Sequence, residues 1–252
     1  MAESTQMVGR VSALLRALAA TESDDGLTTT EVGRATGLPR PTVHRLLESL
    51  AQEGMVDRDG RSGRWFLGPE LFVLGARAAS RFAVTDEAVA AVRRLAEATG
   101  ESAFFSVRRG DETVVLLRQD GAFPIRSFVL YEGARFPLGV VSAGIVVLAY
   151  LDDREIDDYL ARTDLAAAWG DAHSDAAIRD RIGLTRERGW AVNPGLVVEG
   201  SWGMAAAVFD AAGSPRWALT LTGVESRFGP DRQSELGHLL LSEAHQLSRL
   251  IG

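Results

Sequence analysis

Residues 27–56 constrain the fold of this chain more than any other stretch, because two short helical patterns follow each other across a tight junction. Thr29 or Thr30 can cap the first helix by accepting from the free N–H groups of its opening turn. Gly37 follows that helix, where a left-handed residue ends it at little steric cost. The sequence therefore predicts two helices joined by a turn.

The second helix is predicted to start at Pro39 and Pro41, since the first turn of a helix tolerates proline. Its apolar residues recur at helical spacing and predict a buried stripe of Val43, Leu46, Leu47 and Leu50. Its polar face carries Arg40, Thr42, His44, Arg45 and Glu48. A recognition helix presents its N-terminal end to the DNA major groove, where arginine and threonine bond bases and phosphates.

The next residues predict a wing, which separates this interpretation from an ordinary helical hairpin with a solvated polar face. Residues 55–57 and 64–67 read as two short strands around an Asp-Gly and Ser-Gly turn at 59–63. Arg61 and Arg64 would place positive charge at its tip. We expect Arg40, Thr42 and Arg45 to contact bases and phosphates. The DNA backbone contacts are expected from His44, Arg61 and Arg64, and Thr30 is a further expected DNA-binding residue.

Length, charge and composition place the rest of the chain in a second domain. The 252 residues carry a net charge of −7, but the first 68 hold eight arginines against nine acidic residues and are nearly neutral. The chain has no cysteine, which is compatible with the cytoplasm, and no apolar run long enough for a membrane span. We predict a DNA-binding domain at 1–68, a linker helix at 69–83 and a larger domain at 84–252.

The larger domain is predicted to be of the α+β class, with helices on an antiparallel sheet. An amphipathic helix at 8–21 precedes the winged segment, and a helix opening at Pro69 has an apolar face that we expect to pack against another chain. Beyond it we predict a helix at 85–99, a hairpin at 102–120, a strand at 125–133 and a fully apolar helix within 137–151. Surface helices follow at 152–161 and 174–187. A short strand at 190–193, two central strands at 203–209 and 217–222, and a closing helix at 230–251 complete the domain.

Five stretches in this order resemble the IclR family of bacterial transcription regulators, over nearly the whole chain. They are RVSALLRALA, TTTEVGRATGLPRPTVHRLLESLAQEGMV, WFLGPELFVLG, RFPLGVVSAGIVVLAYL, and RERGWAVNPGLVVEGSWGMAAAVFD with the following WALTLTG. The resemblance implies a winged helix-turn-helix, a linker helix and a C-terminal effector domain of the GAF/PAS kind. It also implies operator DNA and a small-molecule effector as partners, and a homodimer that often assembles further into tetramers.

The resemblance further implies an effector pocket between the sheet and the start of the apolar helix. Carried over by matching motifs, its residues are Phe128, Phe136, Ser142, Ala143, Asn193, Ser201, Gly203, Thr220 and Thr222. Free N–H groups at the helix start suit a carboxylate. The family often has an acidic residue at Asn193 and a cysteine at Gly203. Their loss predicts an effector more apolar than a two- or three-carbon acid, such as an aromatic acid. The alternative is that these positions are simply core.

The sequence also bears on two other classes of function. The four histidines form no pair at metal-ligand spacing, and the Ser142-Ala143-Gly144 run lacks the first glycine of a hydrolase elbow, so we expect no catalytic residue, metal or cofactor. A DNA-binding protein whose C-terminal domain only oligomerises remains the alternative. It would show no effector-dependent change in its affinity for DNA.

Overall fold

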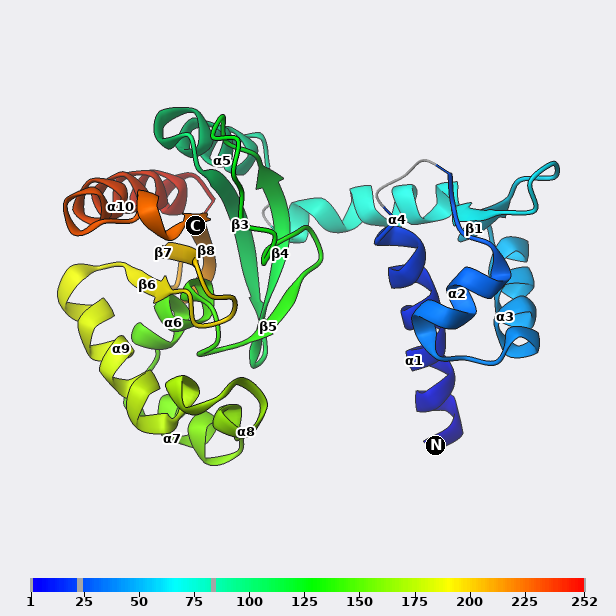
Figure 1. Cartoon of the computed structure of the whole chain (residues 1–252), viewed down its shortest axis with the longest axis horizontal. Coiled ribbons are helices and arrows are strands. Elements are labelled where there is room, and N and C mark those ends of the chain that lie inside the picture. The colour runs from blue at the N-terminus through cyan, green and yellow to red at the C-terminus, as the bar shows by residue number, and fades with distance from the viewer. Residues whose placement is uncertain (1, 22–24, 83–84, 252) are drawn as a thin grey trace. The chain divides into compact units, whose positions relative to one another are not determined.

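The computed structural model describes residues 2–21, 25–82 and 85–251. The chain divides into two compact units, Met1–Arg81 and Phe82–Gly252, each described by itself below (Figure 1). The linker helix α4 (Pro69–Ala79) therefore groups with the N-terminal unit. None of the helices in the described ranges is long and apolar enough to cross a membrane.

The N-terminal unit is a helix-turn-helix followed by a two-stranded wing. It comprises α1 (Ala2–Ala19), α2 (Thr29–Thr36), α3 (Arg40–Gln52), β1 (Val56–Arg58), β2 (Trp65–Leu67) and α4. Its core consists of Leu14, Leu18, Val32, Val43, Leu47, Leu50, Val56 and Trp65. Gly37 ends α2 in the left-handed conformation that the sequence predicts, with φ at 69°.

The cap of α2 lies one residue earlier than predicted. Thr28, not Thr29 or Thr30, accepts from the backbone N–H of Glu31 at 3.3 Å, and Glu31 accepts from the backbone N–H of Thr28 at 2.7 Å. This reciprocal capping box satisfies two N–H groups at once, which a cap at Thr29 or Thr30 would not do. Thr29 instead contacts the wing, because its hydroxyl accepts a hydrogen bond from the indole N–H of Trp65 at 3.0 Å.

The C-terminal unit is built on a six-stranded antiparallel sheet in the order β5-β4-β3-β8-β7-β6 (Figure 1). Its strands are β3 (Ser102–Arg109), β4 (Glu112–Gln119), β5 (Arg135–Pro137), β6 (Ala191–Pro194), β7 (Ser201–Phe209) and β8 (Pro215–Val224). Its α-helices are α5 (Asp86–Thr99), α6 (Ser142–Ala149), α7 (Asp153–Ala161), α8 (Leu165–Trp169), α9 (Asp175–Arg188) and α10 (Pro230–Ile251). Short 3-10 turns lie at Ser80–Phe82, Asp171–His173 and Glu225–Arg227.

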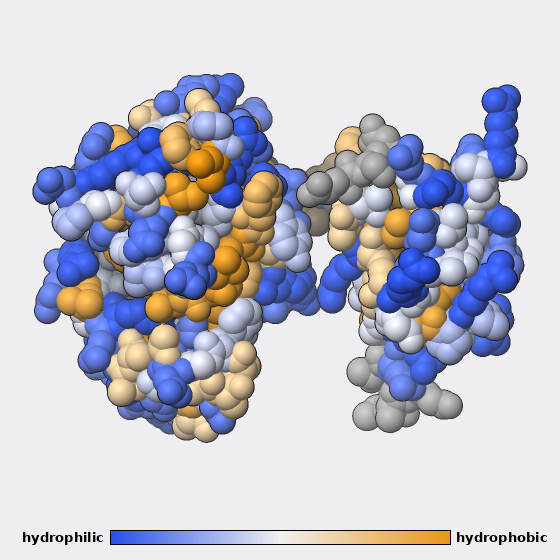
Figure 2. Space-filling view, in the orientation of Figure 1, coloured by the Kyte–Doolittle hydropathy of each residue, from blue (hydrophilic) through white to orange (hydrophobic). Residues whose placement is uncertain are grey.

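Helices pack on both faces of this sheet because its central strands are apolar on both sides. On β8, Trp217, Leu219 and Leu221 belong to the core beneath α5 and α10, whereas Ala218 belongs to the core around α6. All eight residues of α6 are buried, which confirms the prediction that this apolar helix forms the centre of the domain. In the space-filling view, hydrophilic residues rim an apolar area on the drawn face of this unit (Figure 2).

The predicted strand at 125–133 is wrong, because these residues form an irregular loop between β4 and β5, here called the β4–β5 loop (residues 120–134). Side chains take the place of a strand partner there. The backbone N–H of Arg118 donates to Glu132 Oε1 at 3.2 Å, and the hydroxyl of Ser127 accepts from the N–H of Val129 at 3.3 Å. Regular strand pairing with β4 is confined to the following three residues, β5, and the adjacent Gly133 and Ala134 exchange backbone hydrogen bonds with Val115.

Candidate nucleic-acid interface and ligand cavity

Helix α3 buries one side and exposes the polar residues that the sequence predicts to meet DNA. Val43, Leu47 and Leu50 are buried. Arg40, His44 and Arg45 are exposed and Thr42 is half-buried, while Thr30 is exposed in the first turn of α2. The polar face thus includes the N-terminal turns of α3, as in recognition helices.

The wing is tied to α3 by charged residues on its first strand. Arg58 Nη1 lies 3.5 Å from Glu48 Oε1, and the Nδ1 atom of His44 lies 3.8 Å from the same oxygen. The Arg58 guanidinium also sits over the ring of Trp65, 5.3 Å from its centroid. Glu48 therefore offsets the positive charge of Arg58 beside this part of the helix.

The wing turn is ordered by Asp59, which keeps Arg61 exposed. The Asp59 carboxylate accepts from the backbone N–H groups of Arg61 at 3.2 Å and Ser62 at 2.6 Å, and from the Ser62 hydroxyl at 2.7 Å. These hydrogen bonds, those from Ser62 foremost, lower the pKa of Asp59. The turn is therefore ordered by hydrogen bonds within itself.

Arg64 lies differently from the other predicted DNA contacts. Its Nη1 donates to the backbone oxygen of Gly26 at 2.9 Å and to Glu31 Oε2 at 3.3 Å. The pKa of Glu31 is lowered, first by its hydrogen bonds with Thr28 and further by the charge of Arg64. The guanidinium of Arg64 therefore joins the wing to the capping box of α2 instead of projecting from the wing tip.

In the C-terminal unit, the predicted effector residues Ser142, Asn193, Ser201, Gly203 and Thr222 line one small cavity, here called the inner cavity. They come from α6, β6, β7 and β8. The remainder of its wall is mostly apolar and consists of Val129, Leu130, Val141, Val197 and Trp202. Its volume of about 20 Å³ is room for a single water molecule.

Thr222 lines this cavity and carries a hydroxyl that is unsatisfied among the described residues. The hydroxyl of Thr222 is buried and has no hydrogen-bond partner in the described part of the chain. A buried, unpaired hydroxyl costs stability unless a ligand or water bonds it. Val141 is the N-cap residue of α6 and makes no side-chain cap hydrogen bond, so it does not satisfy the backbone N–H groups of the first turn, to which the cavity residue Ser142 belongs.

Asn193 lines the inner cavity, but both ends of its amide are already engaged. Its Nδ2 donates to the backbone oxygen of Val140 at 2.8 Å, and its Oδ1 accepts from the N–H of Leu196 at 3.0 Å. His173, which the sequence places in a loop, is fully buried and approaches the same Val140 oxygen with its Nε2 at 3.3 Å. The two side chains thus fix the backbone just before α6.

Burial lowers the pKa of His173, although its hydrogen bond to Val140 acts in the opposite direction. Its Nδ1 lies 3.1 Å from the backbone oxygen of Trp169. No sequence motif marks this residue, because its role depends on a carbonyl group 33 positions away. The sequence interpretation did not include His173 in the site, nor did it include Ser127 or the apolar wall residues of the inner cavity.

A wider cleft, here called the outer cleft, adjoins the inner cavity and has a volume of about 510 Å³. The two share Val129 and Ser201, and the predicted wall residue Phe128 lines the outer cleft with its side chain largely exposed. Such a volume is typical of a site for a small organic molecule. The outer cleft and the inner cavity therefore form two compartments of one site.

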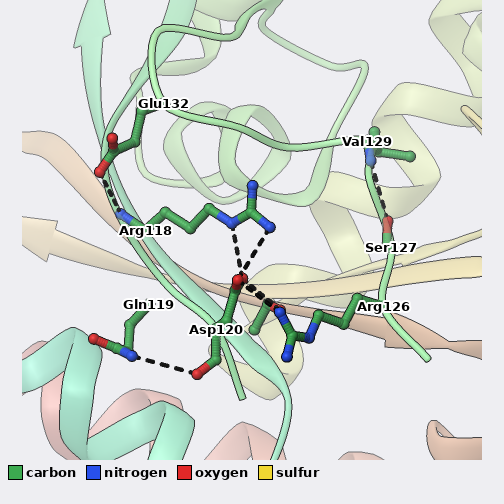
Figure 3. A network of polar contacts seen from close by, with 8 residues as sticks. Arg118, Gln119, Asp120, Arg126, Ser127, Val129 and Glu132 are labelled. Carbon is green, nitrogen blue, oxygen red and sulfur yellow. Dashed lines mark hydrogen bonds and ion pairs between the residues drawn. The ribbon is translucent and has the colours of Figure 1, made fainter. Parts of the chain in front are cut away.

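Charged residues at the end of β4 and the start of the β4–β5 loop form a polar network that includes Arg126 (Figure 3). Asp120 accepts from Arg118 Nε at 2.8 Å and from Arg126 Nη1 at 2.8 Å. Burial raises the pKa of Asp120, but the hydrogen bond and the charges of these arginines outweigh it and leave the pKa lowered. Arg126 lines the cleft, as does the acidic Glu199.

Three predicted pocket residues do not line either compartment. Phe136 lies on β5 and packs against Trp169 with ring centroids 5.9 Å apart. Ala143 is buried within the core around α6. Thr220 is fully buried and its hydroxyl has no partner in the described residues. It shares a sheet face with Thr222, two positions along β8, as predicted.

Comparisons with known proteins agree with this architecture. The family model described as "Bacterial transcriptional regulator IclR C-terminal" matches residues 76–249, and the IclR helix-turn-helix model matches residues 7–60. The "Glycerol operon regulatory protein" of Streptomyces griseus is 32% identical over 92% of this chain and 89% of its own length.

Two solved structures share the fold over nearly their whole length. An IclR transcriptional regulator from Alicyclobacillus acidocaldarius has a TM-score of 0.79 and 25% identity, covering 98% of this chain and 99% of that one. An IclR homolog from Microbacterium hydrocarbonoxydans, complexed with 4-hydroxybenzoate, has a TM-score of 0.76 and 20% identity, covering 97% and 99%. The chain therefore belongs to the IclR family of transcriptional regulators, which are not enzymes and which combine a DNA-binding helix-turn-helix with an effector-binding C-terminal domain.

Proposed function

We propose that this protein binds operator DNA as a dimer in the cytoplasm and that a small organic acid changes its affinity for that DNA. The observation that carries the effector half of this proposal is the unpartnered hydroxyl of Thr222, buried beside the start of α6 in an otherwise mostly apolar cavity. A carboxylate suits the N–H groups of Ser142 and Ala143 at that helix end. The apolar walls suit an aromatic or similarly apolar body.

In the DNA half of the proposal, α3 enters the major groove and the wing contacts the backbone. Arg40, Thr42 and Arg45 contact bases and phosphates, and Thr30, His44 and Arg61 contact the DNA backbone. Arg64 is proposed to act mainly by positioning the wing, because its guanidinium already bonds Gly26 and Glu31.

The dimer is proposed to form partly through α4, with tetramers as a further assembly. None of the residues of α4 is buried within the chain, and Phe72, Val73 and Leu74 are exposed. An isolated apolar helix face of this kind is typical of a surface that a second chain covers. Two recognition helices in a dimer would match two half-sites of a roughly palindromic operator.

Fluorescence anisotropy on DNA fragments from upstream of this gene and its neighbours tests the proposal. Scrambled DNA and two salt concentrations separate specific from phosphate-driven binding. Benzoate, 4-hydroxybenzoate, pyruvate and glyoxylate are then added in turn. We expect an aromatic acid to shift the affinity roughly 5- to 150-fold, the usual range of allosteric coupling.

Each other outcome has a definite meaning. A response to pyruvate or glyoxylate but to neither aromatic acid contradicts the apolar effector. Specific DNA binding that no compound of an enlarged acid panel alters, with no saturable ligand binding by calorimetry, favours a C-terminal domain that only oligomerises. Equal affinity for every fragment and for scrambled DNA contradicts sequence-specific recognition.

A further inference from the structure

The inner cavity is too small for any organic effector in the conformation described here. Its volume of about 20 Å³ contrasts with about 510 Å³ for the outer cleft. Ligand sites for organic molecules usually measure roughly 300–1,000 Å³. A ligand that reaches the hydroxyl of Thr222 must therefore join the two compartments by moving what separates them.

The β4–β5 loop is held firmly at both of its ends. At its start, the N–H of Phe123 donates to the backbone oxygen of Gly100 at 3.0 Å, and the Arg227 guanidinium lies 4.1 Å from the Phe123 ring centroid. At its other end, the N–H of Gly133 donates to the backbone oxygen of Val115 at 2.8 Å. The N–H of Val115 donates in turn to the backbone oxygen of Ala134 at 3.0 Å. These contacts fix both ends of the loop, whereas its middle is held by the core packing of Leu130 and Val129 and by few hydrogen bonds.

The middle of the loop, residues 124–131, has a single hydrogen bond to another element among the described residues. It joins the hydroxyls of Ser127 and Ser201, which lie 2.5 Å apart. The salt bridge of Arg126 runs back to Asp120 within the same loop (Figure 3) and so does not attach the loop to β7. Ser201 and Val129 line both compartments, which places this hydroxyl pair at the boundary between them.

We propose that Ser127 is a specificity-determining residue of the ligand site, because its bond to Ser201 closes the inner cavity against the outer cleft. A ligand that occupies both compartments replaces this bond with a polar group of its own. The site should therefore select an apolar ligand that carries two hydrogen-bonding groups. One group would bond Ser127 and Ser201, and the other would bond Thr222. This inference deepens the proposed function and rests on it for the identity of the ligand class, but the closure itself is testable without any ligand.

The absence of cysteine from the chain permits a direct test of the closure. Ser142→Cys places one thiol in the inner cavity, where Ser142 is 2% exposed. Its labelling by 5,5′-dithiobis(2-nitrobenzoate) reports how often the cavity opens. We expect Ser127→Ala in this background to raise the labelling rate about three- to tenfold, the effect of one hydroxyl hydrogen bond. Ser201→Ala, which breaks only the hydroxyl pair, should also raise the labelling rate, and the double variant should not exceed Ser127→Ala, because Ser127→Ala already breaks that pair together with the hydrogen bond from the Val129 N–H.

Ser248→Ala is the matched control, because it removes hydrogen bonds from the same domain away from the cavity. The hydroxyl of Ser248 accepts from the N–H of Phe209 at 3.0 Å and donates to the backbone oxygen of Ala244 at 2.7 Å. An unchanged rate in Ser127→Ala, or an equal rise in Ser248→Ala, overturns the inference. Thr222→Cys serves as the reporter if Ser142→Cys does not fold. Because neither DNA nor effector is present, failure here leaves the proposed regulator untouched, and failure of the DNA experiment leaves the closure untouched.

Discussion

The candidate DNA interface and the ligand cavity are assembled in opposite ways. The interface is continuous in sequence: its residues lie on α2, α3 and the wing, and its turn is ordered by contacts within five residues of Asp59. The cavity draws on residues from α6, β6, β7, β8 and the β4–β5 loop, and its Asn193–Val140 contact spans 53 positions. The comparison teaches that a contiguous site can be recognised from local pattern, whereas a dispersed site depends on packing.

If the DNA interface depends only on contacts within the N-terminal unit, removing a core side chain from that unit should leave the stability of the C-terminal unit unchanged. Leu47→Ala removes a fully buried side chain of α3 and should lower the stability of the N-terminal unit by about 2–5 kcal/mol. Differential scanning calorimetry should show one transition moving to lower temperature while the second stays in place. Equal movement of both transitions would contradict the independence of the two units.

Removing a single contact from the interface should affect DNA affinity but not folding. Arg45→Ala should weaken specific DNA binding by about 1–3 kcal/mol if the side chain reads a base. Its side chain is exposed, so the thermal transitions should not move. Anisotropy with specific and scrambled DNA distinguishes the roles, since an equal loss on both would make Arg45 a phosphate contact.

A single substitution at the ligand cavity should instead lower both the stability of the C-terminal unit and its affinity for the effector. Asn193→Ala leaves the N–H of Leu196 and the backbone oxygen of Val140 with one partner fewer, at a cost of about 1–3 kcal/mol. We expect weaker effector binding with unchanged affinity for DNA in the absence of effector. Calorimetric titration measures the first and anisotropy the second. Intact effector binding would show that Asn193 does not hold the start of α6 in a binding geometry.

The smallest expected effect is a pH dependence confined to the C-terminal unit. Burial holds the pKa of His173 below its ordinary value of 6.5, so the folded state binds this proton less readily than the unfolded state. Its contribution to stability is therefore complete above pH 6.5 and is lost as the pH falls through the lowered pKa. His173→Gln should flatten the fall in the transition temperature of this unit between about pH 7.5 and about pH 5. An unchanged slope would assign the pH dependence to other groups.

The misplaced elements have a common cause in competition from side chains. The sequence predicted a strand at 125–133, but Glu132 and Ser127 satisfy backbone groups that a strand pairing would have used. The cap of α2 moved to Thr28 because Glu31, three residues later, completes a reciprocal bond. Both outcomes depend on which donor and acceptor meet in space, and hydrophobic periodicity carries no information about that.

The sequence by itself determined the class of fold, the recognition helix with its buried stripe, the wing and the buried apolar helix. These follow from periodicity, caps and turns, which act over a few residues. Only the tertiary structure decided that Arg64 is engaged with Gly26 and Glu31, that Asn193 and His173 hold Val140, and that Ser127 and Ser201 meet at the boundary of the cavity. Each of these contacts joins residues more than 30 positions apart, and the packing of the whole domain, not the local pattern, sets which side chains meet.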